Sequence, residues 1–129
     1  MKTIAISIRN RVFSESIHMM LRQTGDFQPV RLTAALPDMV LIECRAKRPD
    51  ILLMDVMPFP PEVTPEGRLE LAERLKGELP QCKTVLFCDE TAYPQLAREV
   101  MRAKQSGKVD QFLYASVTLE YLTATLEAL

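Results

Sequence analysis

The sequence predicts an α/β protein in which a doubly wound, five-stranded parallel sheet carries helices on both faces. Strand-like and helix-like segments alternate along the whole chain, and roughly 12 to 20 residues separate successive strand-like runs, as parallel strands joined by crossover helices require. The run Ile51 to Met54 is unbroken and apolar, which is typical of a strand buried on both faces. These observations together predict right-handed βαβ crossovers in a three-layered domain.

The segments follow one another as five βα units. We expect strands over Thr3 to Ile8, Gln28 to Thr33, Ile51 to Asp55, Lys83 to Cys88 and Val109 to Tyr114. We expect helices over Val12 to Thr24, Pro37 to Lys47, Pro65 to a stop at Pro80, Pro94 to Lys104 and Thr118 to Leu129. The strand segments are rich in apolar and β-branched residues, whereas apolar residues in the helical segments recur every three or four positions.

Helix boundaries are predicted from residues with restricted or permissive backbones. Gly25 ends the first helix, and Arg48-Pro49-Asp50 breaks the second before the central strand. Pro37 and Pro65 suit the first helical position, where the missing N–H group leaves no hydrogen bond unmade. Thr64 offers a side-chain oxygen that caps the third helix.

One apolar stripe on each helix is expected to face the sheet. On the first four helices the stripes are Phe13, Ile17, Met20 and Leu21; Val40, Leu41 and Cys44; Leu69, Ala72 and Leu75; and Leu96, Val100 and Met101. The last helix carries more apolar residues than one stripe needs, namely Leu119, Tyr121, Leu122, Leu126 and Leu129. Either this helix has a broad core-facing stripe, or it also forms a homodimer.

Length and composition predict one soluble domain spanning residues 1 to 129, with any output domain outside this chain. Apolar residues make up 47% and charged residues 26%, so disordered and fibrous classes are excluded. The net charge of -1 provides no basic field for nucleic acid. No apolar stretch approaches the roughly 20 residues that span a bilayer, and the first residues lead into a strand rather than a signal peptide. We therefore expect a cytoplasmic protein that binds neither membrane nor nucleic acid.

The cysteines and the histidine show no metal-binding pattern. Cys44, Cys82 and Cys88 lack CxxC spacing and a nearby histidine, so they are expected to be reduced thiols. His18 lies within an amphipathic helical pattern and is expected to be structural or exposed.

In a doubly wound sheet, the carboxyl ends of the first, third, fourth and fifth strands meet in one crevice. The residues expected there are Ile8-Arg9-Asn10, Asp55, Cys88-Asp89 and Ala115-Ser116. Asp55 is the main candidate for chemistry, because it places a carboxylate at the end of a buried strand. The alternative is a solvated aspartate that starts a loop.

A family pattern is carried by Arg48 to Asp55, Met57-Pro58, Gly67 to Leu71, Val109 to Tyr114 and Val117 to Glu120. These segments resemble the receiver domain of two-component response regulators, especially the receivers of LuxR-type transcription regulators. The resemblance implies a flavodoxin-like sheet with strand order 2-1-3-4-5. It also implies that Asp55 accepts a phosphoryl group from a histidine kinase, with Mg²⁺ neutralising the transferring group.

The positions that assist phosphoryl transfer in that family are altered here. Ile8-Arg9 replaces the acidic pair that holds Mg²⁺, Ala115 replaces the lysine, and Cys88 replaces the hydroxyl residue of the switch. Phe112 matches the aromatic switch residue. An apolar residue and a cation cannot bind Mg²⁺, which requires oxygen ligands, so no metal site is expected.

The remaining oxygen ligands are few. Asp55 and the carbonyl of Met57 are still present as possible Mg²⁺ ligands. Asp89, beside Glu90, is a further weak candidate ligand. Alternatively, these two acids form the exposed start of a loop and helix, where they complement the positive helix end. No cofactor is expected, except Mg²⁺ if Asp55 is still phosphorylated. Three prolines, at 58, 60 and 61, are expected to stiffen the loop after Asp55.

Arg9 has two alternative positions. It either folds into the crevice and pairs with Asp55, taking the charge-neutralising place of the metal, or points to solvent from its loop. A pairing at ~4 Å is worth roughly 4 kcal/mol at an effective dielectric near 20, before desolvation is subtracted.

Two functions are weighed within the receiver family. The chain is either a phosphorelay receiver that uses Asp55 or, because the metal-binding acids and the lysine are missing, a phosphorylation-independent interaction module. The second function is favoured. Its partner would be a histidine kinase or another signalling protein. The alternative is a flavodoxin-like domain that binds a small ligand such as FMN, but the loop after the first strand has no glycine to cradle phosphate. The chain is not expected to be an enzyme.

Overall fold

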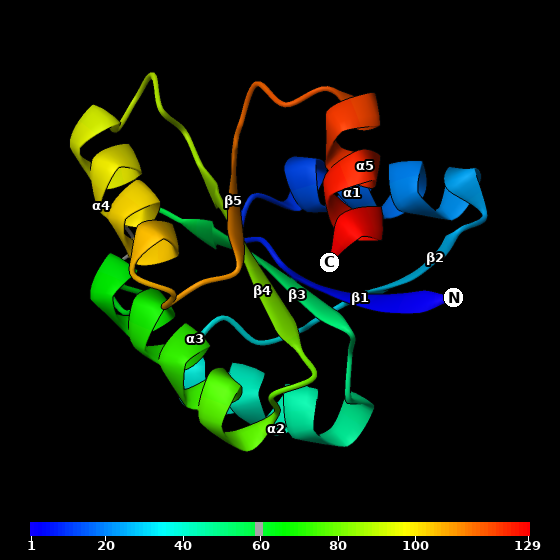
Figure 1. Ribbon diagram of the computed structural model, residues 1–129, viewed down its shortest axis with the longest axis horizontal. Coiled ribbons are helices and arrows are strands. Elements are labelled where there is room, and N and C mark those ends of the chain that lie inside the picture. Colours follow the sequence, from blue (N-terminus) through cyan, green and yellow to red (C-terminus); the bar gives the residue numbers. More distant parts are fainter. Residues whose placement is uncertain (59–60) are drawn as a thin grey trace.

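Strands and helices alternate along the chain in the computed structural model, which describes residues 1–58 and 61–129 (Figure 1). The strands are β1 (Lys2–Ser7), β2 (Phe27–Arg31), β3 (Ile51–Val56), β4 (Lys83–Cys88) and β5 (Gln111–Tyr114). The helices are α1 (Arg11–Thr24), α2 (Pro37–Lys47), α3 (Pro65–Glu78), α4 (Pro94–Gln105) and α5 (Leu119–Ala128). The sheet is parallel and has the order β2-β1-β3-β4-β5, which confirms the predicted fold class.

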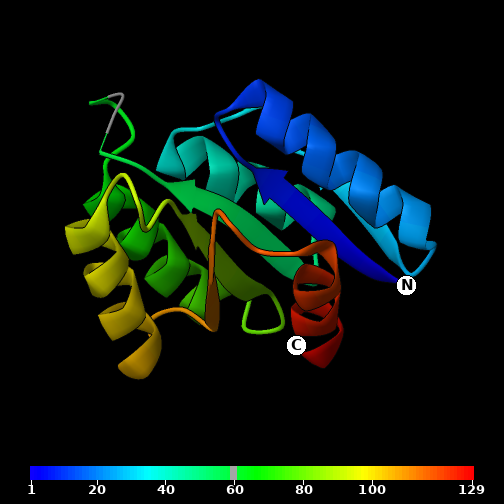
Figure 2. The same cartoon turned by 90° about the horizontal axis from the view of Figure 1, so that it is seen from above.

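The sheet separates two hydrophobic cores. Figure 1 shows α1 and α5 on one face and α2, α3 and α4 on the other, and Figure 2 places α1 and α4 at opposite edges of the molecule. The side chains of β3 alternate between the cores, with Leu52 and Met54 facing α2 to α4 and Ile51 and Leu53 facing α1 and α5. All six residues of β3 are buried, as its apolar sequence predicts for a central strand.

Most helix boundaries follow the predicted caps. Thr64 accepts a hydrogen bond from the backbone N–H of Gly67, and Pro65 begins α3. Gly25 has φ 73° and donates its N–H to the carbonyl of Arg22, which is the left-handed ending that glycine favours. The segment after β3 includes Pro60, and the predicted stiffness of that segment therefore falls partly outside the described residues.

The predicted bounds of four strands are wrong by one or two residues. β1 spans Lys2–Ser7 rather than Thr3 to Ile8, β2 spans Phe27–Arg31 rather than Gln28 to Thr33, and β3 ends at Val56 rather than Asp55. β5 begins at Gln111 because the N–H of Val109 is directed back to the carbonyl of Ala103 at the end of α4. Val109 is still buried, so burial alone did not distinguish the strand from the turn before it.

Two inward stripes also differ from the prediction. Met101 is 37% exposed, so its assignment to the core is wrong; the small residues Ala97 and Ala103 face the core beside Leu96 and Val100. On α3 the buried stripe is Arg68, Leu71, Ala72 and Leu75, with Leu69 only partly buried at its edge. On α5 only Leu122 and Leu126 are buried. No helix in the described ranges is long and apolar enough to cross a membrane.

Two aspartates tie the amino ends of neighbouring strands together. Asp50, just before β3, accepts from the N–H of Thr3 at 2.8 Å and donates its own N–H to the Thr3 carbonyl at 2.9 Å. Asp110, just before β5, makes the same exchange with Thr84, at 2.8 and 3.1 Å. Asp110 also accepts from Nζ of Lys76 at 3.2 Å, which joins α3 to this edge of the sheet.

Replacing Asp110 with alanine is expected to lower the free energy of unfolding by about 2 kcal/mol, because the N–H of the fully buried Thr84 loses a charged acceptor. Urea denaturation measures this change. Lys76→Met should cost less than about 1 kcal/mol, since its ion pair is partly exposed to solvent. Equal losses in both variants would show that the ion pair, and not the backbone contact, carries the effect.

Candidate functional site

The carboxyl ends of the central strands enclose a hollow of about 270 Å³. It is lined by Ile8, Asn10, Phe13, Asp55, Val56, Met57, Phe87, Cys88, Asp89 and Ala115. The structure thus brings together seven of the residues singled out for the crevice: Ile8, Asn10, Asp55, Met57, Cys88, Asp89 and Ala115. Phe112 lies elsewhere, half-buried against the core of α2 to α4, with its ring edge-on to Tyr114 at a centroid distance of 5.5 Å.

Asp55 is buried, with 6% of its surface exposed, and its carboxylate meets two arginines. Oδ2 accepts from the backbone N–H of Arg9 at 3.2 Å, and Nε of Arg9 lies 3.4 Å from Oδ1 and 3.3 Å from Oδ2. Oδ1 also accepts from Nη2 of Arg68 at 3.3 Å. The reading in which Asp55 is a solvated loop residue therefore does not hold.

Arg9 takes the first of its two predicted positions. Its side chain is 11% exposed and pairs with Asp55, and its Nη1 donates to the carbonyl of Val63 at 3.0 Å. Because Val63 lies just before α3 and is buried, Arg9 joins the end of β1 to the segment that leads into that helix. One guanidinium thus connects three parts of the crevice.

Arg68 is a site residue that we did not predict. It belongs to the first turns of α3 and has no exposed surface. Its Nη1 donates to Oγ of Ser7 at 2.8 Å, and its Nη2 lies 3.4 Å from the Ser7 carbonyl and 3.3 Å from Asp55. Its Nε is buried and makes no hydrogen bond among the described residues. The spacing of Arg68, Leu71 and Leu75 is the signal that would have placed this arginine on the inward face of α3.

The arginine contacts use the acceptor capacity of Asp55. An ionised carboxylate has about four lone-pair sites, and here both oxygens face two N–H contacts. The distances of 3.2 to 3.4 Å are longer than in tight charged hydrogen bonds, so the cluster is held as much by charge as by directed bonds. A carboxylate in this state must release an arginine before either oxygen can act as a nucleophile.

The cluster carries two positive charges and one negative charge. Burial lowers the pKa of the Arg68 guanidinium to about 10, while Asp55 raises it and Arg9 lowers it further. A pKa near 10 still keeps Arg68 charged at neutral pH. The cluster therefore carries net positive charge around the Asp55 carboxylate, which is unfavourable for a divalent cation.

The residues of the hollow do not suit Mg²⁺. Ile8 is buried and apolar, and Asp89 turns its carboxylate back to the N–H groups of Thr91 and Ala92 at 3.1 and 2.9 Å. Glu90 accepts from the hydroxyl of Ser116 at 2.8 Å. No group of three potential ligands occurs in the part of the chain that the structure describes. Mg²⁺ requires several oxygen ligands in near-octahedral geometry, and this site does not offer them.

Two further residues that line the hollow, Cys88 and Ala115, contribute no charged or hydroxyl group to it. Cys88 is 2% exposed, and burial raises the pKa of its thiol to about 11, with Asp89 and Glu90 adding to the rise. Ala115 borders the hollow without any polar side chain. These two positions therefore contribute a neutral thiol and a methyl group to the hollow.

No family model and no curated protein matches this sequence. Solved structures do match it over almost its full length. A LuxR-family DNA-binding response regulator from Staphylococcus aureus superposes with a TM-score of 0.78 at 13% identity, covering 99% of this chain and 98% of the other. The fold is that of response regulator receivers. At this level of identity, the likeness concerns the fold alone.

Two further solved structures match the chain with similar scores. The response regulator TrrA from Thermotoga maritima, solved with Mg²⁺ and BeF, matches with a TM-score of 0.74 at 16% identity over 99% of this chain and 98% of its own. A protein described as one of a family of redox sensors in streptococci, evolved from two-component response regulators, matches with a TM-score of 0.74 at 16% identity. That match covers 99% of this chain and 50% of the sensor.

Proposed function

We propose that this chain is an atypical receiver module of a two-component system that acts through protein contacts without accepting a phosphoryl group. The single observation that carries this proposal is the Asp55 carboxylate lying between Arg9 and Arg68. The arginines neutralise the charge that Mg²⁺ would neutralise in a phosphorylated receiver. The module therefore needs no cofactor, and its partner is a histidine kinase or another signalling protein.

The contact between Arg9 and Val63 supports a constitutive state. In this reading, Arg9 holds the carboxyl end of β3 and the entry to α3 in one arrangement at all times. The fold would then present one fixed surface to its partner. A homodimer through α5 remains part of the proposal, because Leu119 is 39% and Tyr121 is 60% exposed on that helix.

Binding of a flavin phosphate finds no support at the corresponding position. The backbone N–H of Arg9, between β1 and α1, already donates to Asp55, and the side chain of Asn10 accepts from Phe13 to cap α1. A phosphate cradle needs several free N–H groups at this point. The geometry favours an interaction module over a nucleotide-binding domain.

Phosphodonor treatment tests the proposal directly. With acetyl phosphate and excess Mg²⁺, the intact mass of the protein should not change, and beryllofluoride with Mg²⁺ should not shift amide NMR signals around Asp55. The triple variant Ile8→Asp/Arg9→Asp/Ala115→Lys places two acids and a lysine at positions beside the same carboxylate. If its circular dichroism shows that it folds, this variant should respond to beryllofluoride in a Mg²⁺-dependent manner.

An ordinary receiver treated in parallel shows that the reagents are active. A mass increase of one phosphoryl group on the natural sequence, mapped to Asp55, would contradict the proposal and restore the phosphorelay function.

A further inference from the structure

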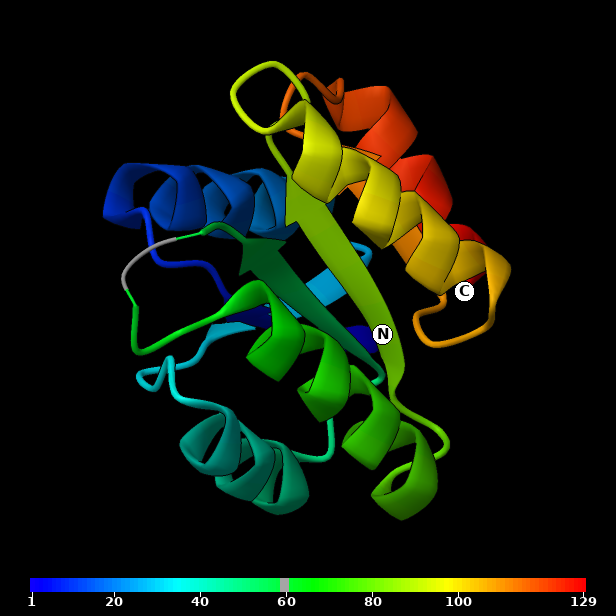
Figure 3. The same ribbon diagram turned by 90° about the vertical axis from the view of Figure 1, so that its left-hand side faces the viewer.

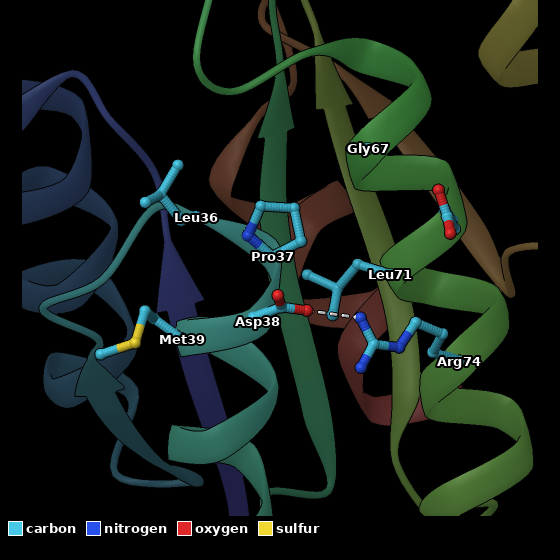
Figure 4. A pocket seen from close by; sticks show the side chains of 8 residues that line it. Leu36, Pro37, Asp38, Met39, Gly67, Leu71 and Arg74 are labelled. Carbon is cyan, nitrogen blue, oxygen red and sulfur yellow. Dashed lines mark hydrogen bonds and ion pairs between the residues drawn. The ribbon is translucent and has the colours of Figure 1, made fainter.

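A groove of about 510 Å³ lies between α2 and α3, on the face of the sheet away from α1 and α5. Figures 1 and 3 show these two helices side by side, and Figure 4 shows the groove between their first turns. It is lined by Leu36, Pro37, Asp38, Met39, Gly67, Glu70, Leu71 and Arg74. The groove is separate from the hollow at Asp55, since the two share no lining residue.

The α2 side of the groove carries exposed apolar side chains beside Asp38. Leu36 is 49% and Met39 is 51% exposed, and Ile42, three residues further along α2, is 52% exposed. The core-facing side chains of this helix are Val40, Leu41 and Cys44. α2 therefore carries a second apolar strip that the core of this domain does not cover, and exposed apolar strips of this kind mark protein contact sites.

The lining residues of α3 define the shape of the groove. Gly67, Glu70, Leu71 and Arg74 have the spacing i, i+3, i+4 and i+7, which is one face of a helix over two turns, or roughly 10 Å. Leu71 is buried beneath the groove, and at Gly67 the ring of Pro37 lies 3.5 Å from where a Cβ would stand, so α2 packs closely on α3 at that end. A groove that runs along a helix axis for this length matches the helix-in-groove mode of peptide recognition.

The charges at the groove are unbalanced. Arg74 is already paired with Asp38 across the groove at 2.7 Å, as the dashed line in Figure 4 shows. The charged lining residues Asp38, Glu70 and Arg74 together carry one net negative charge, and Glu66, one turn earlier on α3, is a further exposed acid. The groove is therefore weakly acidic. Two copies of this chain meeting groove to groove would bring like charges together, whereas a basic partner would not.

We propose that the groove between α2 and α3 binds an amphipathic helix of a partner protein, one that presents apolar side chains flanked by lysine or arginine. The apolar side chains pack between Leu36 and Met39 above Leu71. A basic side chain of the partner faces Glu70. This surface is independent of Asp55, so the inference stands or fails separately from the proposed lack of phosphoryl transfer.

Two synthetic peptides of about four helical turns test this inference. One combines leucine at i, i+3, i+4 and i+7 with lysine elsewhere, and the other has the same leucines with glutamate in place of lysine. The lysine peptide, labelled with a fluorophore, should bind the full chain, as measured by anisotropy, while the glutamate peptide should not. Amide NMR shifts on titration should cluster on the first turns of α2 and along α3.

Variants test whether the groove is the site at which the lysine peptide binds. The double variant Leu36→Ser/Met39→Ser should weaken binding of the lysine peptide at least about tenfold, and Glu70→Gln about two- to fivefold. The matched control is Val12→Ser/Met19→Ser, which removes two exposed apolar side chains from α1 and should leave affinity unchanged.

Three outcomes would overturn the proposal. An unchanged affinity in the Leu36→Ser/Met39→Ser variant would show that the peptide binds by charge alone. Amide NMR shifts located away from α2 and α3 would show that it binds at another site. Sedimentation that reveals a dimer abolished by Leu36→Ser/Met39→Ser would assign the groove to a second copy of the chain instead.

Discussion

Replacing Asp55 with alanine is expected to lower the free energy of unfolding by about 3 to 5 kcal/mol, as found when one partner of a buried ion pair is removed. The reason is that Arg68 is fully buried and Arg9 is nearly so, and both lose the carboxylate that compensates their charge. The pKa of Arg68, lowered to about 10 by burial, shows how unfavourable the protein interior already is for that charge. Most domains have a total stability of only about 5 to 15 kcal/mol, so the variant would be close to unfolding.

Urea denaturation monitored by circular dichroism measures this loss. The double variant Asp55→Ala/Arg68→Met should recover part of it, because it removes one of the two uncompensated charges along with the carboxylate. Asp26→Asn, which changes an exposed acid, should alter stability by less than about 0.5 kcal/mol. A loss below about 1 kcal/mol in Asp55→Ala would mean that the arginines reach solvent when the carboxylate is absent, and that the cluster contributes little to the fold.

The second large effect concerns the three cysteines, which are expected to react very slowly in the folded protein. Burial raises the pKa of Cys44 and Cys88 to about 11 and that of Cys82 to about 12, from an ordinary value of 9.0. Only the thiolate reacts, and each unit of pKa changes its fraction tenfold. Thiolate reactivity at pH 8 should therefore fall by about 100-fold at Cys44 and Cys88 and about 1000-fold at Cys82, relative to unfolded chain.

A chromogenic disulfide reagent measures these rates in native buffer and in urea. Fast modification of one thiol in the folded state would show that this thiol is accessible and has an ordinary pKa, contrary to our expectation.

The same thiols are expected to make the free energy of unfolding depend on pH. Their pKa values are higher in the folded than in the unfolded chain, so the unfolded chain loses its protons first. The free energy of unfolding should therefore fall as the pH rises from about 9 toward 11 or 12. Below pH 9 the contribution of the thiols is constant.

The sequence by itself determined the architecture. The unbroken apolar run of β3 and the alternation of helical and extended patterns are local signals, and they were sufficient for the parallel sheet, its layers and the element boundaries to within one or two residues. The position of Asp55 at the carboxyl end of β3 followed from the same signals. Its neighbours Ile8, Cys88 and Ala115 followed as well, because parallel strands bring equivalent ends to one edge of the sheet.

Only the tertiary structure decided the state of that site. Sequence left Arg9 with two positions, because the direction of a long side chain in a loop depends on groups that are distant along the chain. The position of Arg68 on α3 was not predicted, since its partners Ser7 and Asp55 lie on β1 and β3 and meet it only after α3 packs on the sheet. Local pattern fixes which residues form a strand or a helix, whereas a buried charge is placed by the compensating charges that folding brings to it.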